Sequence, residues 1–138
     1  MKRNTALGIG IAATLAATFL WHGIGGAGER LAGSIDRTMR TTLDHYEMPA
    51  VAARTQRDPL TRRLMLDGPA DDFQRSEISR IALEVPGVAA AYWAGPRPPA
   101  RAIPLFVEVM LMALAAFAIG VVLAYIVALR RRAREAFE

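Results

Sequence analysis

Two long apolar stretches lie near the ends of the chain, and a segment of alternating polar and apolar residues lies between them. Residues 5–21 carry no charged side chain, and residues 103–129 carry a single one, Glu108. A helix needs ~20 mainly apolar residues to cross the hydrocarbon core of a bilayer. The second stretch exceeds that length, and the first reaches it when it is extended through the glycine-rich residues 22–28. The pattern therefore predicts two transmembrane helices.

The first stretch also fits another interpretation. The basic residues Lys2 and Arg3 before an apolar run are typical of a secretory signal peptide as well as of an anchor. Gly25-Gly26-Ala27 would then be the small-residue cleavage site. We favour the retained helix and keep the cleaved signal peptide as the alternative.

The segment between the stretches begins with a helical period and changes to a period of two. In residues 29–47, apolar side chains recur every three or four positions while charges fill the other face, which predicts an amphipathic helix. Residues 50–56 are compatible with a short strand. Residues 60–68 alternate, with Leu64 and Leu66 on one face, which predicts a half-buried strand.

A capped helix and a last strand complete this segment. Asp71 and Gln74 have the spacing of a capping box, and apolar residues from Ile78 onward form one helix face. Pro86-Gly87 ends the helix, and residues 88–93 follow as a strand. We expect an α+β fold with the order helix, strand, strand, helix, strand (αββαβ).

The chain is therefore expected to comprise five segments. They are an N-terminal transmembrane helix, a folded α+β domain, a proline-rich linker, a C-terminal transmembrane helix and a basic tail. Their bounds are 1–28, 29–93, 94–102, 103–129 and 130–138.

The distribution of charge predicts the topology and argues against nucleic acid as a partner. Residues 29–101 hold 11 Arg and 10 Asp or Glu, so the middle of the chain lacks the excess of positive charge that binding to phosphates requires. The net charge of +4 comes from the two ends. Basic residues flank the cytoplasmic ends of membrane helices, whereas loops longer than ~60 residues cross largely regardless of charge. We expect both termini in the cytoplasm of a bacterium and the domain in the periplasm.

Several side chains are expected at the membrane interface, because they are amphipathic or basic and flank an apolar stretch. They are Trp21, His22, Arg97, Arg101, Arg130, Arg131 and Arg132. The chain has no cysteine and only two histidines, so its candidates for metal ligation are few. We expect no cofactor, with a haem or chlorophyll held by His22 as the less favoured alternative.

The second apolar stretch carries small residues at a spacing of four. Such a stripe lets another helix approach closely, either the first span of the same chain or a helix of another subunit. The residues of this stripe are Ala116, Gly120, Ala124 and Ala128. Glu108 lies in the first turns of the same stretch. It is expected at the interface or in helix packing rather than in proton transfer, the alternative role of a carboxylate inside a membrane.

The folded segment resembles a BON domain, a small α/β module of bacterial envelope proteins. The resemblance is carried by Leu64-Met65-Leu66-Asp67-Gly68-Pro69, a polar helix start, and Val85-Pro86-Gly87-Val88. It implies structural turns at Gly68 and Gly87, with Gly87 in the reversal between helix and strand. It also implies a role in binding envelope components or in stabilising larger assemblies, and it supplies no catalytic residues.

These observations favour a protein that is not an enzyme. We expect an accessory subunit of an inner-membrane protein complex, such as a photosynthetic or respiratory complex. Its spans would pack against other integral membrane subunits and lipid, and its domain would dock on a periplasmic surface. The alternative is a free-standing envelope module in which Arg97 and Arg101 contact phospholipid head groups or peptidoglycan.

Overall fold

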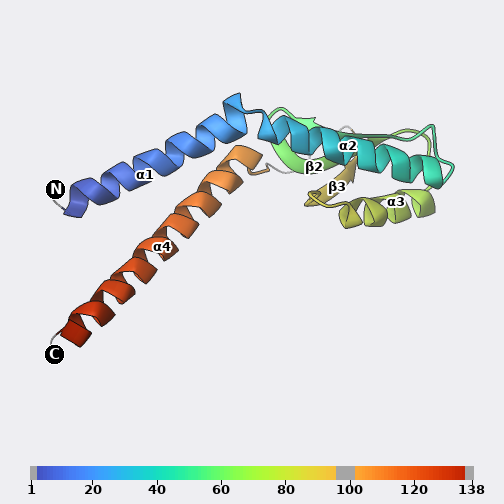
Figure 1. Ribbon diagram of the computed structural model, residues 1–138. Helices are drawn as coiled ribbons and strands as arrows, with labels where there is room; N and C mark the ends of the chain where they lie inside the picture. The colour runs from blue at the N-terminus through green and yellow to red at the C-terminus, as the bar shows by residue number, and fades with distance from the viewer. Residues whose placement is uncertain (1–2, 96–101, 136–138) are drawn as a thin grey trace.

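The computed structural model describes residues 3–95 and 102–135 of the chain. The described residues form a mixed α+β fold with two long apolar helices (Figure 1). The elements, in chain order, are α1 (Arg3–Phe19), the π-helical turn η1 (Leu20–Ile24), α2 (Ala27–His45), β1 (Ala52–Arg57), β2 (Leu60–Asp67), α3 (Asp72–Glu84), β3 (Ala90–Trp93) and α4 (Leu105–Glu135).

The three strands form one sheet in the order β1-β2-β3. β1 and β2 are antiparallel neighbours, and β2 and β3 are parallel, with α3 as the connection between them. β2 is therefore the central strand, and β1 and β3 are the two edges. One face of the sheet carries Leu64 and Leu66, and the other carries Arg63 and Met65, because side chains alternate along a strand.

The core lies on the Leu64 face, between the sheet and the helices α2 and α3. Leu64 and Leu66 have no exposed surface, and they belong to the same buried cluster as Met39 of α2 and Ala82 of α3. Ile35, Met39 and Leu43 recur every four residues on one side of α2, so a single stripe of this amphipathic helix faces the sheet. Both helices thus cover the face with Leu64 and Leu66, whereas Arg63 and Met65 on the other face are partly exposed.

The capping box expected at the start of α3 is present. The Gln74 backbone N–H donates to the Asp71 carboxylate at 2.7 Å, and the Asp71 N–H donates to Gln74 Oε1 at 3.0 Å. At the sheet, Trp93 Nε1 donates to the Arg75 carbonyl and to Ser79 Oγ, which joins β3 to α3. These hydrogen bonds of α3 therefore stabilise the start of the helix and its attachment to the sheet.

Two glycines occupy turns that a side chain would strain. Gly68 follows β2 with a φ of +137°, and Gly87 follows α3 with a φ of +99°. A Cβ on residue 87 would also lie 3.0 Å from Ile35 Cδ1, so the backbone of this turn packs closely on α2. Glycine is required there for both its φ and its size.

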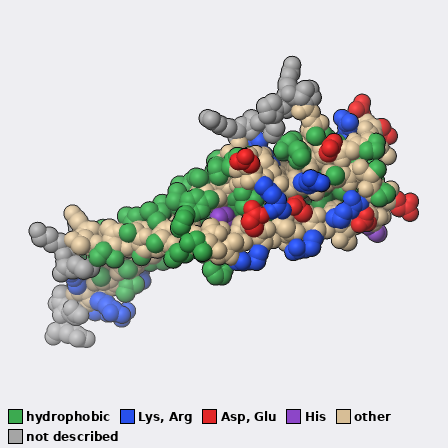
Figure 2. Space-filling model, turned by 90° about the horizontal axis from the view of Figure 1, so that it is seen from above, with side chains coloured by type: hydrophobic (Ala, Val, Ile, Leu, Met, Phe, Trp, Pro, Cys, Tyr) green, Lys and Arg blue, Asp and Glu red, His purple; other side chains and the backbone are tan. Residues whose placement is uncertain are grey.

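Two helical segments, Asn4–Ile24 and Leu105–Arg134, are long and apolar enough to cross a membrane. α1 and α4 meet where Gly10 packs against Phe117: a Cβ on Gly10 would lie only 2.6 Å from the tip of that ring. In Figure 1 they diverge from the domain toward the N- and C-termini, which lie at the same end of the molecule. Figure 2 shows hydrophobic side chains along these helices and most charged side chains over the domain.

The structure differs from the sequence expectations at several boundaries. α4 continues past residue 129, so the first residues of the basic tail are helical. The last strand begins at Ala90 rather than at residue 88, because Val88 is still bonded to Val85 in the turn. The expected linker, residues 94–102, lies mostly outside the described residues.

The close packing at Gly87 gives a prediction about stability. Gly87→Ala should lower the free energy of unfolding by ~1–3 kcal/mol, because alanine is strained at this φ. The measurement is urea unfolding of the full chain in detergent micelles, followed by tryptophan fluorescence. Gly120→Ala is the matched control, since a Cβ there meets nothing within 4 Å and alanine favours a helix. Equal losses in the two variants would contradict the prediction.

Candidate functional site

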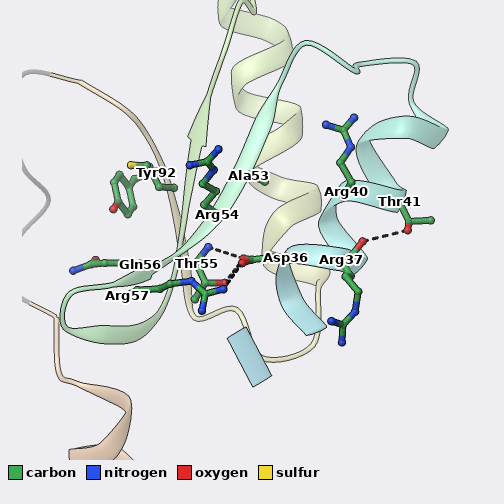
Figure 3. Close-up of a pocket in the computed structure, with 11 residues that line it drawn as sticks. Asp36, Arg37, Arg40, Thr41, Ala53, Arg54, Thr55, Gln56, Arg57 and Tyr92 are labelled. Carbon is green, nitrogen blue, oxygen red and sulfur yellow. Dashed lines mark hydrogen bonds and ion pairs between the residues drawn. The ribbon is translucent and has the colours of Figure 1, made fainter. Parts of the chain in front are cut away.

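An open groove of about 870 Å³ runs along the outer edge of β1, between this strand and α2. Figure 3 shows Arg37 and Arg40 on the α2 side of β1, and Arg54 and Tyr92 on its other side. The groove therefore extends around the free edge of the sheet. Its lining residues are Asp36, Arg37, Arg40, Thr41, Ala53, Arg54, Thr55, Gln56, Arg57, Met65 and Tyr92.

Asp36 connects α2 to the edge strand. Its Oδ1 accepts hydrogen bonds from the backbone N–H and from the hydroxyl of Thr55, at 2.7 and 2.6 Å. Its Oδ2 pairs with Arg57 at 2.8 Å, and Arg57 also pairs with Glu29. The hydrogen bond to Asp36, assisted by the charge of Glu29, raises the pKa of Arg57 above its usual value despite partial desolvation. Arg57 is thus committed to carboxylates within the domain.

Arg40 is also occupied. It pairs with Asp44 one turn further along α2, and its NH1 donates to the carbonyl of Val51 at 3.2 Å. This second contact satisfies an acceptor at the beginning of the edge strand. Arg40 and Arg57 therefore hold α2 against the two ends of β1.

The remaining two arginines have no such partners. Arg37 and Arg54 are exposed, and within residues 3–95 and 102–135 neither forms a side-chain hydrogen bond or ion pair. Asp36, Glu29 and Asp44 pair with Arg57 and Arg40, so among the described residues the unpaired guanidiniums of the groove are those of Arg37 and Arg54. A groove with two unpaired guanidiniums can bind an anionic group such as a carboxylate or phosphate.

A second candidate region is the junction where both apolar helices reach the domain. Phe106, in the first turn of α4, lies against Phe19 at a centroid distance of 6.2 Å, edge to face. The same ring lies 6.1 Å from the imidazole of His22. Leu60, at the start of β2, completes a shallow cavity beside these rings.

An ion pair joins the central strand to α4 at this junction. Arg62 Nε lies 2.8 Å from Glu108 Oε2, although the N–H does not point at the oxygen with hydrogen-bond geometry. The two side chains are 42% and 30% exposed, so water weakens the pair only in part. Glu108 is therefore oriented toward the domain.

The junction does not suit a haem or chlorophyll on the inner nitrogen of His22. His22 Nε2 is buried without a hydrogen-bond partner. A Cβ on Gly28 would lie 2.9 Å from that nitrogen and 2.9 Å from Leu60 Cδ2, so Nε2 faces closely packed protein atoms. A porphyrin metal has no approach to it in this packing. Within the described residues, no group of three or more His, Cys, Asp or Glu side chains could hold a metal ion.

The residues expected at the membrane interface lie in different places. Trp21 is 69% exposed on η1, beside His22, while Arg130, Arg131 and Arg132 are exposed on the last turns of α4. Arg97 and Arg101 lie outside the described residues. The structure does not bring these groups together into one site.

The small-residue stripe of α4 is exposed along its whole length, and Gly120 has nothing within 4 Å of its Cβ position. α1 instead meets α4 on the neighbouring face, through Gly10 and Phe117. The four residues of the stripe, Ala116, Gly120, Ala124 and Ala128, are thus exposed beside the face of α4 that α1 contacts.

Sequence reasoning did not find the groove or the Arg62–Glu108 pair. Arg37 was expected as one of several charges on the outer face of α2. The alternation of Arg54 and Gln56 with Ala53 and Thr55 was the available signal that this strand has a polar face. Comparisons with models of protein families, with curated proteins and with solved structures found no match to the chain. The resemblance to a BON domain therefore stays a prediction.

The Arg62–Glu108 pair gives a prediction about the junction. A double-mutant cycle with Arg62→Gln and Glu108→Gln should give a coupling free energy of ~1 kcal/mol, the upper end for partly exposed pairs. The measurement is again urea unfolding in detergent. The pair Arg80–Glu84, exposed on α3, is the control and should give a smaller coupling. A coupling for Arg62–Glu108 no larger than that of the control would show that the junction does not depend on it.

Proposed function

We propose that the chain is a non-catalytic, two-span accessory subunit of a bacterial inner-membrane protein complex. The observation that carries this proposal is the junction, where both apolar helices meet the domain at one corner. Only Gly25 and Gly26 separate η1 from α2, and the Arg62–Glu108 pair joins β2 to α4. A domain tethered at two points keeps a defined orientation to its spans, which is what docking on a neighbouring subunit requires.

The contact between α1 and α4 supports the retained helix over the cleaved signal peptide. Gly10 leaves room for the Phe117 ring, and Phe19 contacts Phe106, so cleavage after residue 27 would remove a packed partner of α4. The four arginines at the end of α4 support a cytoplasmic C-terminus. With both termini at the same end of the molecule, the domain would be periplasmic.

The order of elements supports a BON-like domain. α2, β1, β2, α3 and β3 follow the order helix, strand, strand, helix, strand. Members of that family bind envelope components or stabilise assemblies, so the resemblance agrees with a docking role. A fold supports a function only by analogy, and the surfaces of this chain must supply the contacts.

The exposed stripe of α4 supports a helix of another subunit as its partner. Small side chains let helix backbones approach closely, and packing at close range is a main source of helix association in lipid. The partner would lie beside α4 on the face next to the one that contacts α1.

The alternative, a free-standing module that binds phospholipid head groups or peptidoglycan, is favoured by a different observation. Arg37 and Arg54 provide an unpaired basic surface, in addition to the Arg97 and Arg101 expected from the sequence. Such a protein would bind anionic lipid or polymer without an integral membrane partner.

The subunit proposal predicts a large native assembly. After mild solubilisation of the native membrane, the protein should migrate in a complex well above its own 15.0 kDa. Gly120→Leu should release it, because the larger side chain separates the packed helices. Val122→Leu is the control, at an exposed position of α4 outside the stripe. Migration of the wild-type chain only as a free species would disprove a subunit role.

The topology can be tested by single cysteines, since the chain has none of its own. A cysteine at Ala52, on the exposed start of β1, should react in intact spheroplasts with a membrane-impermeant maleimide. A cysteine at Ala133, in the exposed last turn of α4, should react only once the membrane is opened. The reverse pattern would place the domain in the cytoplasm.

A further inference from the structure

Within the described part of the chain, the backbone N–H and carbonyl of Ala53 are unpaired at the free edge of the sheet. The N–H of Thr55 points outward, because Asp36 on α2 accepts it, and the carbonyl of Val51 also points outward, to Arg40. Alternate residues of a strand direct their backbone groups to the same side. Ala53, between them, therefore directs its N–H and carbonyl into the groove, and neither group has a partner among the described residues.

Two other backbone groups that point to the same side as those of Ala53 are already bonded. Asp36 occupies the N–H of Thr55, and Arg40 occupies the carbonyl of Val51. Side chains that cover an edge strand in this way prevent uncontrolled pairing with other strands. They leave the N–H and carbonyl of Ala53 unpaired in the groove, where the backbone of an extended peptide can bond to both.

Unpaired arginines lie on both sides of this exposed backbone. Arg37 lies on the α2 side of β1, and Arg54 lies on the opposite face of the sheet (Figure 3). Arg54 is in register with Met65, which is in register with Tyr92, so an apolar row lies beside the Arg54 guanidinium. An added strand directs successive side chains to opposite faces of the sheet.

We propose that the groove docks an extended acidic segment of a partner protein. The segment would pair its backbone with the N–H and carbonyl of Ala53. Successive acidic side chains would reach Arg37 on one side and Arg54 on the other, and an apolar side chain would lie on Met65 and Tyr92. This inference rests on the proposed function, and it names the surface by which the subunit's domain docks.

The position of the groove disfavours head groups of the protein's own bilayer. Arg37 lies ten residues beyond the start of α2, a rise of ~15 Å along the helix. Figure 1 shows α2 extending away from the end of α1. The head-group layer on each side of a bilayer is only ~6 Å thick, so the groove lies beyond it. An extended peptide, unlike a phosphate, also supplies the backbone N–H and carbonyl that Ala53 can pair with.

The test measures binding of a fluorescent nine-residue peptide to the full chain in nanodiscs made of neutral lipid. The peptide has three Glu-Val-Thr repeats, so that its successive Glu side chains fall on opposite faces of an added strand. The peptide should bind, and the same peptide with Gln in place of Glu should bind at least about fivefold more weakly. Arg37→Gln with Arg54→Gln should weaken the Glu peptide by about the same factor, because two exposed ion pairs are lost. Arg80→Gln, which removes an arginine of α3 outside the groove, should leave binding unchanged.

The backbone contact is tested separately. Ala53→Pro removes the outward N–H at an edge position that tolerates proline, and it should weaken binding by about threefold or more. If this variant unfolds, a peptide N-methylated at every second residue tests the same contact on the wild-type protein.

An N-methylated peptide that binds as well as its parent would overturn docking at the edge. Binding that is unchanged when Arg37 and Arg54 are replaced would overturn it as well. Stronger, arginine-dependent binding of soluble peptidoglycan fragments or of vesicles with anionic lipid would also overturn it. These outcomes are independent of the size of the native complex, which tests the subunit role.

Discussion

The bonds made by the Asp36 carboxylate attach the edge strand of the sheet to α2 and determine which charges of the groove remain unpaired. One oxygen accepts from the backbone and hydroxyl of Thr55, and the other pairs with Arg57, so this side chain of α2 bonds to two residues of the edge strand. Each hydrogen bond to a charged group of this kind contributes ~1.5–3 kcal/mol when it is sheltered from water, and less here because Asp36 is partly exposed. Asp36 and Arg37 are successive residues of a helix and so point in different directions, and Asp36 bonds to Thr55 and Arg57 rather than to Arg37. The same carboxylate therefore stabilises the fold and leaves a positive charge free at the groove.

Much of the fold could be predicted because its signals are local. The Asp71–Gln74 capping box determines where α3 begins, since both partners lie within one turn of each other. The alternation around Leu64 and Leu66 predicts a strand with one buried face, and that face forms the core. The apolar stretches are equally local, and both appear as helices long enough to cross a membrane. Periodicity identifies the buried face of each element but not its neighbour in space.

The candidate site could not be predicted, because it depends on contacts between residues far apart in the chain. Nothing in the sequence around Arg62 indicates that Glu108 is its partner, and the sequence assigned Glu108 to the membrane interface or to helix packing without naming a contact. Likewise, the position of β1 at the edge of the sheet follows from which strands pair with β2. Without that order, Arg54 is one of many surface charges, and Ala53 is an ordinary residue of a strand.

The two apolar helices differ in length, and in the proposed membrane setting this difference would make the molecule sensitive to bilayer thickness. The segment Asn4–Ile24 rises ~30 Å, which equals the thickness of a typical hydrocarbon core, whereas Leu105 to Leu129 of α4 rises ~37 Å. In the proposed membrane setting, α4 must therefore tilt more than α1, in agreement with the divergence of the two helices in Figure 1. Helices tilt further as a bilayer becomes thinner. The end of α1 and the start of α4 are held beside the domain by the contacts of Phe106 with Phe19 and His22. Thinning of the bilayer would therefore change the angle at which the domain stands above the surface.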